Sequence, residues 1–95
     1  MEELQIGRIV HYVLSQSDVD DIRHTRRIRG IIANPVSVGQ HVSAIVVAIW
    51  PDEFGLSLDG INAKCFLDGN DEYWVTSRQY DEFMSNGTWH WPERE

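Results

Sequence analysis

The sequence predicts a mainly β fold, namely a small antiparallel barrel of five or six strands with one early α-helix. Apolar residues alternate over several segments of strand length, which is the pattern of half-buried strands. One early segment has capping residues at both of its ends, as helices do. The 95 residues hold no linker and no βαβ pattern, so we expect one domain with strongly bent antiparallel strands, of the SH3-like type.

The first half of the chain predicts a strand, a helix and a second strand. Ile6–Leu14 is rich in β-branched and apolar residues, which favours a strand. We expect a helix over Asp18–Arg29, because Ser17 is a candidate N-cap, acidic residues fill the first turn and arginines fill the last. Gly30 is the natural stop after it.

The segment His41–Trp50 has the strongest strand pattern in the chain, and it is apolar on both faces. One face is expected to carry Val42, Ala44, Val46, Ala48 and Trp50, and the other Ser43, Ile45, Val47 and Ile49. Such a strand is either central in the sheet, or one face meets the helix or a second subunit.

The second half predicts a hairpin and two minor elements. Ile61–Leu67 and Glu72–Arg78 are expected to pair across a turn at Asp68–Asp71. A short edge strand is expected at Phe54–Leu58, and a short helical turn at Tyr80–Met84.

A final strand is expected after the Asn86-Gly87 turn. Its tryptophans, Trp89 and Trp91, point to one face, whereas Thr88 and His90 point to the other. The first face would fill the core, and the second would present a hydroxyl and an imidazole.

Composition argues against several classes of protein. The net charge of −7 argues against a protein that coats nucleic acid, because phosphate contacts need a basic face. The single cysteine, Cys65, excludes an internal disulfide and is expected to be a buried structural residue. The longest apolar run, Ala44–Trp50, is too short to span a membrane, and no signal peptide is evident, so we expect a cytoplasmic protein.

Four arginines gather between Arg23 and Arg29 in an otherwise acidic chain. Arg26 and Arg29 continue the apolar side of the helix, so they point toward the protein body or toward something bound there. They are candidate ligands for phosphate or carboxylate. The alternative is that they form structural ion pairs or satisfy the helix C-terminus.

The four histidines, His11, His24, His41 and His90, have no metal-ligand spacing, and we expect no metal site. His11 and His90 lie on the first and last strands, which often neighbour each other in a small barrel, so they are expected to flank one pocket. The alternative is that each is a structural, hydrogen-bonded histidine.

No catalytic motif such as GxSxG, a P-loop or GxGxxG is present, so we expect a binding protein without a cofactor rather than an enzyme. A nucleotide-cleaving activity with His11 or His90 as general base stays open. The turn at Asp68–Asp71 offers three acceptor side chains beside Trp74, which suits a ribose or a base, although an Asx turn explains them equally well.

Four blocks of the chain resemble a family of small proteins of tailed phages and prophages: Gly7–Tyr12, Phe66–Asp71, Trp74–Ser77 and Gly87–Glu93. The resemblance implies a phage origin and a compact β fold, and no particular activity. It gives weight to the polar residues within these blocks, which are His11, Asp68, Asn70, Asp71, Ser77, Thr88 and His90.

Three functions compete. The first is a phage counter-defence protein, a sponge that sequesters a small nucleotide-derived immune signal in the host cytoplasm, as a homo-oligomer, without binding nucleic acid polymers or membranes. The second is a virion part or protein-interaction module that uses Val42–Trp50, and the third is an inhibitor of a host enzyme. For the first, the ligand-binding residues are expected to be His11, Tyr12, Arg26, Arg29, Asp68, Asn70, Asp71, Trp74, Ser77, Thr88, His90 and Trp91.

Overall fold

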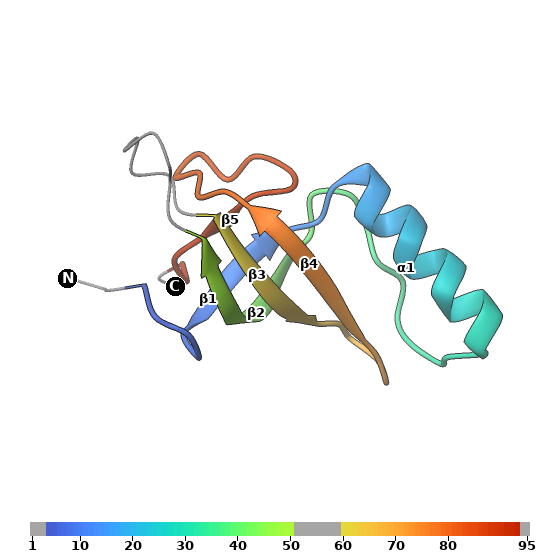
Figure 1. Ribbon diagram of the computed structural model, residues 1–95. Helices are drawn as coiled ribbons and strands as arrows, with labels where there is room; N and C mark the ends of the chain where they lie inside the picture. The colour runs from blue at the N-terminus through green and yellow to red at the C-terminus, as the bar shows by residue number, and fades with distance from the viewer. Residues whose placement is uncertain (1–3, 51–59, 94–95) are drawn as a thin grey trace.

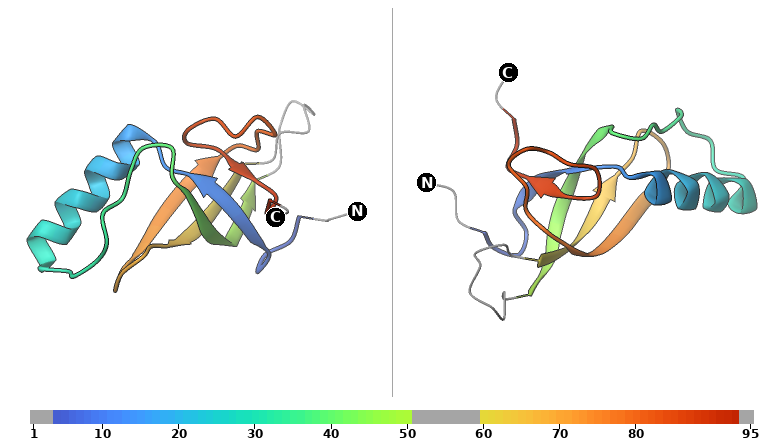
Figure 2. Two further views of the ribbon diagram at one scale, coloured as in Figure 1. Left: turned by 180° about the vertical axis from the view of Figure 1, so that it is seen from behind. Right: turned by 90° about the horizontal axis from the view of Figure 1, so that it is seen from above.

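The described part of the chain is a twisted antiparallel sheet with one helix beside it. The computed structural model describes residues 4–50 and 60–93. Its elements are β1 (Ile9–Val13), α1 (Gln16–Arg29), β2 (His41–Trp50), β3 (Gly60–Phe66), β4 (Glu72–Arg78) and β5 (Trp89–His90). The strands follow the order β4-β3-β2-β1-β5, and every neighbouring pair is antiparallel. The helix α1 lies beside the sheet on the side of β4 (Figure 1), and the further views show the same arrangement (Figure 2).

The mainly β fold with an early helix is confirmed, and the sheet nearly closes on itself. The chain that leaves β4 reaches β5 at the opposite edge, where Tyr80 forms a parallel bridge with Trp89. Two backbone hydrogen bonds make this contact, from Trp89 to the Gln79 carbonyl and from Asp81 to the Trp89 carbonyl, both at 3.0 Å. One bridge, rather than a full strand ladder, therefore joins the two edges of the sheet.

The hydrophobic core lies on the inner face of the sheet and under the first turns of α1. Its largest buried members include Tyr12, Leu14, Val19, Ile61 and Trp89. Trp89 also meets the ring of Tyr80 at 5.0 Å, edge to face, so the last strand is held by aromatic contacts as well as backbone pairing. Cys65 is buried, as expected, and burial raises the pKa of its thiol to about 12.

A β-bulge in β2 changes which side chains face the core. The register with β3 shifts between Val46 and Ala48, which inserts one extra residue into β2. Beyond it, Ile49 stands opposite the buried Ile61 and packs against the core. The prediction that Ala48 and Trp50 share the face of Val46, with Ile49 on the other face, is therefore wrong, because strict alternation ends at the bulge; Trp50 is 53% exposed.

The helix begins two residues earlier than predicted. Ser15, not Ser17, is the N-cap, and it forms a capping box with Asp18. The Asp18 amide donates to Ser15 Oγ at 3.2 Å, and the Ser15 amide donates to the Asp18 carboxylate at 2.8 Å. The predicted end is confirmed, because Gly30 has a left-handed φ of 64° and its amide donates to the Arg26 carbonyl. Among the described residues, no helix is long and apolar enough to cross a membrane.

The segment Tyr80–Met84 is not the short helix that the sequence suggested. Tyr80 extends β4 toward β5, and the Asp81 carboxylate then accepts the amides of Phe83 and Ser85. These side-chain bonds form an Asx-type turn, which competes with helix formation. The predicted edge strand Phe54–Leu58 lies outside the described residues.

A single buried carboxylate, Asp18, connects three parts of the fold. Its side chain is 0% exposed and accepts the hydroxyls of Tyr12 from β1 (2.5 Å) and Tyr73 from β4 (3.0 Å). Arg78, also from β4, donates to it at 3.2 Å. Burial alone would raise the pKa of this carboxyl, but the hydrogen bonds from Tyr12, Ser15 and Tyr73 outweigh burial and hold the pKa below its usual value.

We expect Asp18→Asn to lower the free energy of unfolding by about 2–4 kcal/mol, because several charge-assisted hydrogen bonds are lost and Arg78 loses its counter-ion. Urea unfolding measures this loss. Asp20→Asn is the matched control on the same helix, since Asp20 is exposed and accepts one hydrogen bond from Gln16. Its effect should stay within about 0.5 kcal/mol. Equal losses in the two variants would contradict the role of Asp18.

The same carboxylate should make the free energy of unfolding depend on pH in the acidic range. Because the folded pKa of Asp18 is lowered, its contribution is fully present above the unfolded pKa of about 3.9 and is lost as pH falls through the folded pKa. The stability difference between the wild type and Asp18→Asn should therefore shrink below about pH 4. Urea unfolding of both proteins from neutral pH downward tests this, and a difference that stays constant would contradict it.

Candidate functional site

The predicted site residues gather in two separate places. The first is a pocket of about 520 Å³ between the C-terminal half of α1 and the β3–β4 hairpin, which we call the helix–hairpin pocket. Four of the predicted residues line it, namely Arg29, Asn70, Asp71 and Trp74. Lys64 of β3 also lines it and was not predicted.

Arg26 holds the hairpin against the helix. Its guanidinium donates to both carboxylate oxygens of Asp71, at 2.8 and 3.1 Å, and to the Asn34 carbonyl at 2.8 Å. The two charged side chains are only 11% and 9% exposed, so this bidentate pair is largely shielded from water. For Arg26, the structure therefore shows the structural ion pair that the sequence left as the alternative to a ligand.

The turn of the hairpin packs against the chain that follows α1. Asp68 accepts the side-chain amide of Asn34 at 2.8 Å, and Gly69 forms a bridge with Ala33. A Cβ added at Gly69 would lie 2.1 Å from the Ala33 side chain, so this position requires glycine. Asp68 thus helps to position the wall of the pocket, and it is not one of the lining residues.

The pocket combines two cations with an exposed aromatic ring. Lys64 and Trp74 stand opposite each other on β3 and β4, and Trp74 is 58% exposed. Arg29 comes from the last turn of α1. Among the residues that the structure describes, neither Arg29 nor Lys64 has an ion-pair partner. These side chains are therefore open to an anionic ligand with a planar ring.

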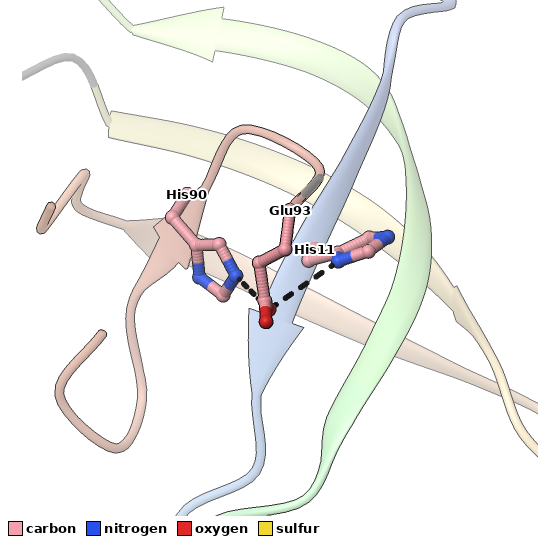
Figure 3. Close-up of side chains that lie close together, drawn as sticks. All are labelled: His11, His90 and Glu93. Atoms are coloured by element: carbon pink, nitrogen blue, oxygen red, sulfur yellow. Dashed lines mark hydrogen bonds and ion pairs between the residues drawn. The ribbon is translucent and has the colours of Figure 1, made fainter. Parts of the chain in front are cut away.

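The second place is a group of three histidines around one carboxylate, which we call the histidine cluster: His11, His41, His90 and Glu93. One oxygen, Glu93 Oε1, hydrogen-bonds with His41 Nδ1 and with His90 Nε2, the latter at 2.7 Å. His11 Nδ1 lies 3.6 Å from the same oxygen. Figure 3 shows the side chains of His11 and His90 on either side of Glu93.

Strand pairing explains why these histidines meet. His11 of β1 stands directly opposite His90 of β5, which confirms the prediction that the first and last strands are neighbours. On the other side, His11 stands opposite Ser43 of β2, and His41 lies two residues before Ser43. Residues two apart on a strand share a face, so all three imidazoles lie on the outer face of the sheet.

The cluster is partly enclosed. The side chain of His90 is 3% exposed and forms its floor, whereas those of His11, His41 and Glu93 are 26%, 34% and 40% exposed. Hydrogen bonding with His41 and His90 lowers the pKa of the Glu93 carboxyl to about 2. Two buried nitrogens, His11 Nδ1 and His90 Nδ1, have no hydrogen-bond partner within the described part of the chain.

The remaining predicted residues lie outside both places. Tyr12 is 1% exposed, and its hydroxyl is taken up by Asp18 in the core. Thr88 donates its hydroxyl to the Ser85 carbonyl. Ser77 has a positive φ of 53°, and its amide donates to the Asn62 side chain. Trp91 meets the ring of Trp89 at 5.4 Å, which confirms that the two tryptophans share a side of the final segment.

Sequence reasoning missed His41, Glu93 and Lys64. The histidines have no recognisable spacing in the chain because they come from three different strands, and only the sheet order brings them together. A usable signal did exist for Glu93, which follows His90 by three residues. Lys64 could have been placed opposite Trp74 by aligning the two arms of the predicted hairpin.

The chain matches no family model, no curated protein and no solved structure.

We expect Arg26→Ala to lower the free energy of unfolding by about 1–3 kcal/mol, because the shielded ion pair is lost and Asp71 keeps its charge without a partner. Arg27→Ala is the control, since Arg27 is an exposed arginine of the same helix and should change stability by less than about 0.5 kcal/mol. Urea unfolding compares the variants. Equal stability of the two would show that Arg26 does not anchor the hairpin.

Proposed function

We propose that the chain binds a small anionic ligand with a planar ring, of nucleotide type, in the helix–hairpin pocket. The observation that carries the proposal is the convergence of Arg29, Lys64, Asn70 and Trp74 on one pocket from three separate segments. A volume of about 520 Å³ is in the range of small-molecule sites.

Each lining group has a role in this proposal. Arg29 and Lys64 pair with phosphate groups, and the exposed ring of Trp74 stacks on the base. The amide of Asn70 supplies both a donor and an acceptor for a base edge or a sugar. Arg26 is left out of the phosphate site, because Asp71 already occupies its guanidinium.

The biological role that we propose is sequestration. The resemblance of four sequence blocks to small phage proteins implies a phage origin, and a phage protein that binds a nucleotide-derived immune signal in the host cytoplasm would act in counter-defence. A sponge of this kind acts by binding its ligand stoichiometrically, without a reaction, so the ligand can be recovered unchanged. A second copy of the chain is the partner that we expect, since signal-binding sites of small proteins often lie near subunit interfaces.

A second candidate is a virion or protein-interaction module. Exposed apolar residues of β1 and β2 favour it, because Ile9, Val47 and Trp50 are exposed by 44%, 39% and 53%. Clustered exposed apolar residues often mark a contact surface. Detection of the protein in purified particles would favour this candidate over the sponge.

We expect a cyclic dinucleotide, a cyclic trinucleotide or an ADP-ribose derivative to raise the melting temperature of the protein by several degrees at about 100 times its Kd. Trp74→Ala should lower the affinity for that ligand by about tenfold, since stacking contributes about 1–3 kcal/mol per base. Arg29→Ala should also lower the affinity for that ligand, because a side chain that pairs with its phosphate groups is lost. Thermal shift and calorimetry measure both effects.

Two controls and one product analysis complete the experiment. Trp50→Ala removes an exposed tryptophan outside the pocket, and Arg27→Ala removes an arginine of the same helical turn outside it. Both should retain wild-type affinity. The proposal is overturned if no ligand of the panel binds, or if the pocket variants bind as well as the controls. Recovery of a chemically altered ligand after heating would show that the protein catalyses a reaction rather than sequestering the ligand.

A further inference from the structure

The histidine cluster brings three potential metal ligands close together on the outer face of the sheet, with His41 beside them. Single donor atoms of His11, His90 and Glu93 all lie within 4.8 Å of one another. His41 is not one of these three donors, but its Nδ1 hydrogen-bonds with Glu93 Oε1, which makes it a candidate for a fourth. The four residues come from β1, β2, β5 and the segment after β5, so the tertiary structure assembles the group.

The donor set suits a divalent first-row transition metal. Imidazole nitrogen and carboxylate oxygen are standard ligands of Zn²⁺, with bonds of about 2.0–2.2 Å. Donor atoms around a tetrahedral ion of that size lie about 3.3 Å apart. The present separations bracket this value: Glu93 Oε1 lies 2.7 Å from His90 Nε2 and 3.6 Å from His11 Nδ1, and the three donor atoms all lie within 4.8 Å of one another.

One nitrogen of the cluster is buried without a hydrogen-bond partner among the described residues. His11 Nδ1 is buried, faces Glu93 at 3.6 Å and has no hydrogen-bond partner in residues 4–50 and 60–93 (Figure 3). Buried polar atoms in folded proteins are nearly always bonded. A metal ion between His11, His90 and Glu93 would coordinate this nitrogen and replace the contact with Glu93.

Glu93 supplies the charged donor of this cluster. Among the described residues, Glu93 is the one carboxylate that forms an ion pair with these histidines. Neutral imidazole is the form that coordinates metal ions.

We propose that His11, His41, His90 and Glu93 bind one divalent first-row transition metal ion, with Zn²⁺ as the expected occupant. His90 forms the buried floor of this site, and His41 and Glu93 form its solvent-facing rim, which leaves a path for the ion to enter. Bound metal would tie the C-terminal segment after β5 to β1 and β2. The site is distinct from the helix–hairpin pocket, with which it shares no residue.

The experiment titrates chelator-treated full-length protein with Zn²⁺ by calorimetry and follows the melting temperature. We expect one equivalent to bind and to raise the melting temperature, because a ligand of the folded state stabilises it. Co²⁺ serves as a spectroscopic probe, since its visible absorption bands report coordination by nitrogen and oxygen donors. Absence of stoichiometric Zn²⁺ binding overturns the proposal. The histidine cluster would then be held together only by hydrogen bonds between its histidines and Glu93.

Ligand variants locate the bound ion. His41→Gln and Glu93→Gln change partly exposed rim residues, so they test the site even if a change at the buried His90 prevents folding. Each should lower the affinity for Zn²⁺ by more than about tenfold. His24→Gln is the matched control, because His24 is an exposed histidine of α1 outside the cluster. Wild-type affinity in both rim variants, or an equal loss in the control, overturns the assignment.

Discussion

The buried carboxylate of Asp18 is the constraint on which the arrangement of helix and sheet depends. It closes the capping box that starts α1 and accepts hydroxyls from two strands that are not neighbours in the sheet, Tyr12 on β1 and Tyr73 on β4. A buried charge is stable only when its hydrogen-bonding capacity is filled, and here four side chains and one backbone amide fill it. The helix is therefore fixed to the sheet by polar contacts of defined geometry, in addition to the packing of Val19 and Ile22.

The curled sheet has a second consequence, which concerns the final segment. Because the chain after β4 bridges to β5, the short last strand is paired on both of its sides, with β1 and with Tyr80. Trp89 then enters the core, and His90 is held on the outer face opposite His11. The two-residue strand thus performs two tasks: one residue anchors it, and the next contributes to the histidine cluster.

The two proposed sites depend on different parts of this framework. Arg26 and Asp71 hold the hairpin tip beside α1, and Arg29, Lys64 and Trp74 are among the exposed residues that line the helix–hairpin pocket. The histidine cluster depends on the register of three strands, β2-β1-β5. A protein of this size can carry both sites because one lies at the edge formed with the helix and the other on the outer face of the sheet.

Local patterns in the sequence determined the elements themselves. The alternation over His41–Trp50 and Glu72–Arg78, the arginine-rich helix end at Gly30 and the Asp68–Asp71 turn all follow from short-range sterics and capping. Only the tertiary structure decided which polar residues meet. Arg26 became a structural partner of Asp71, and three histidines without any linear motif came together, because strand register and the bulge in β2 depend on contacts between residues far apart in the chain.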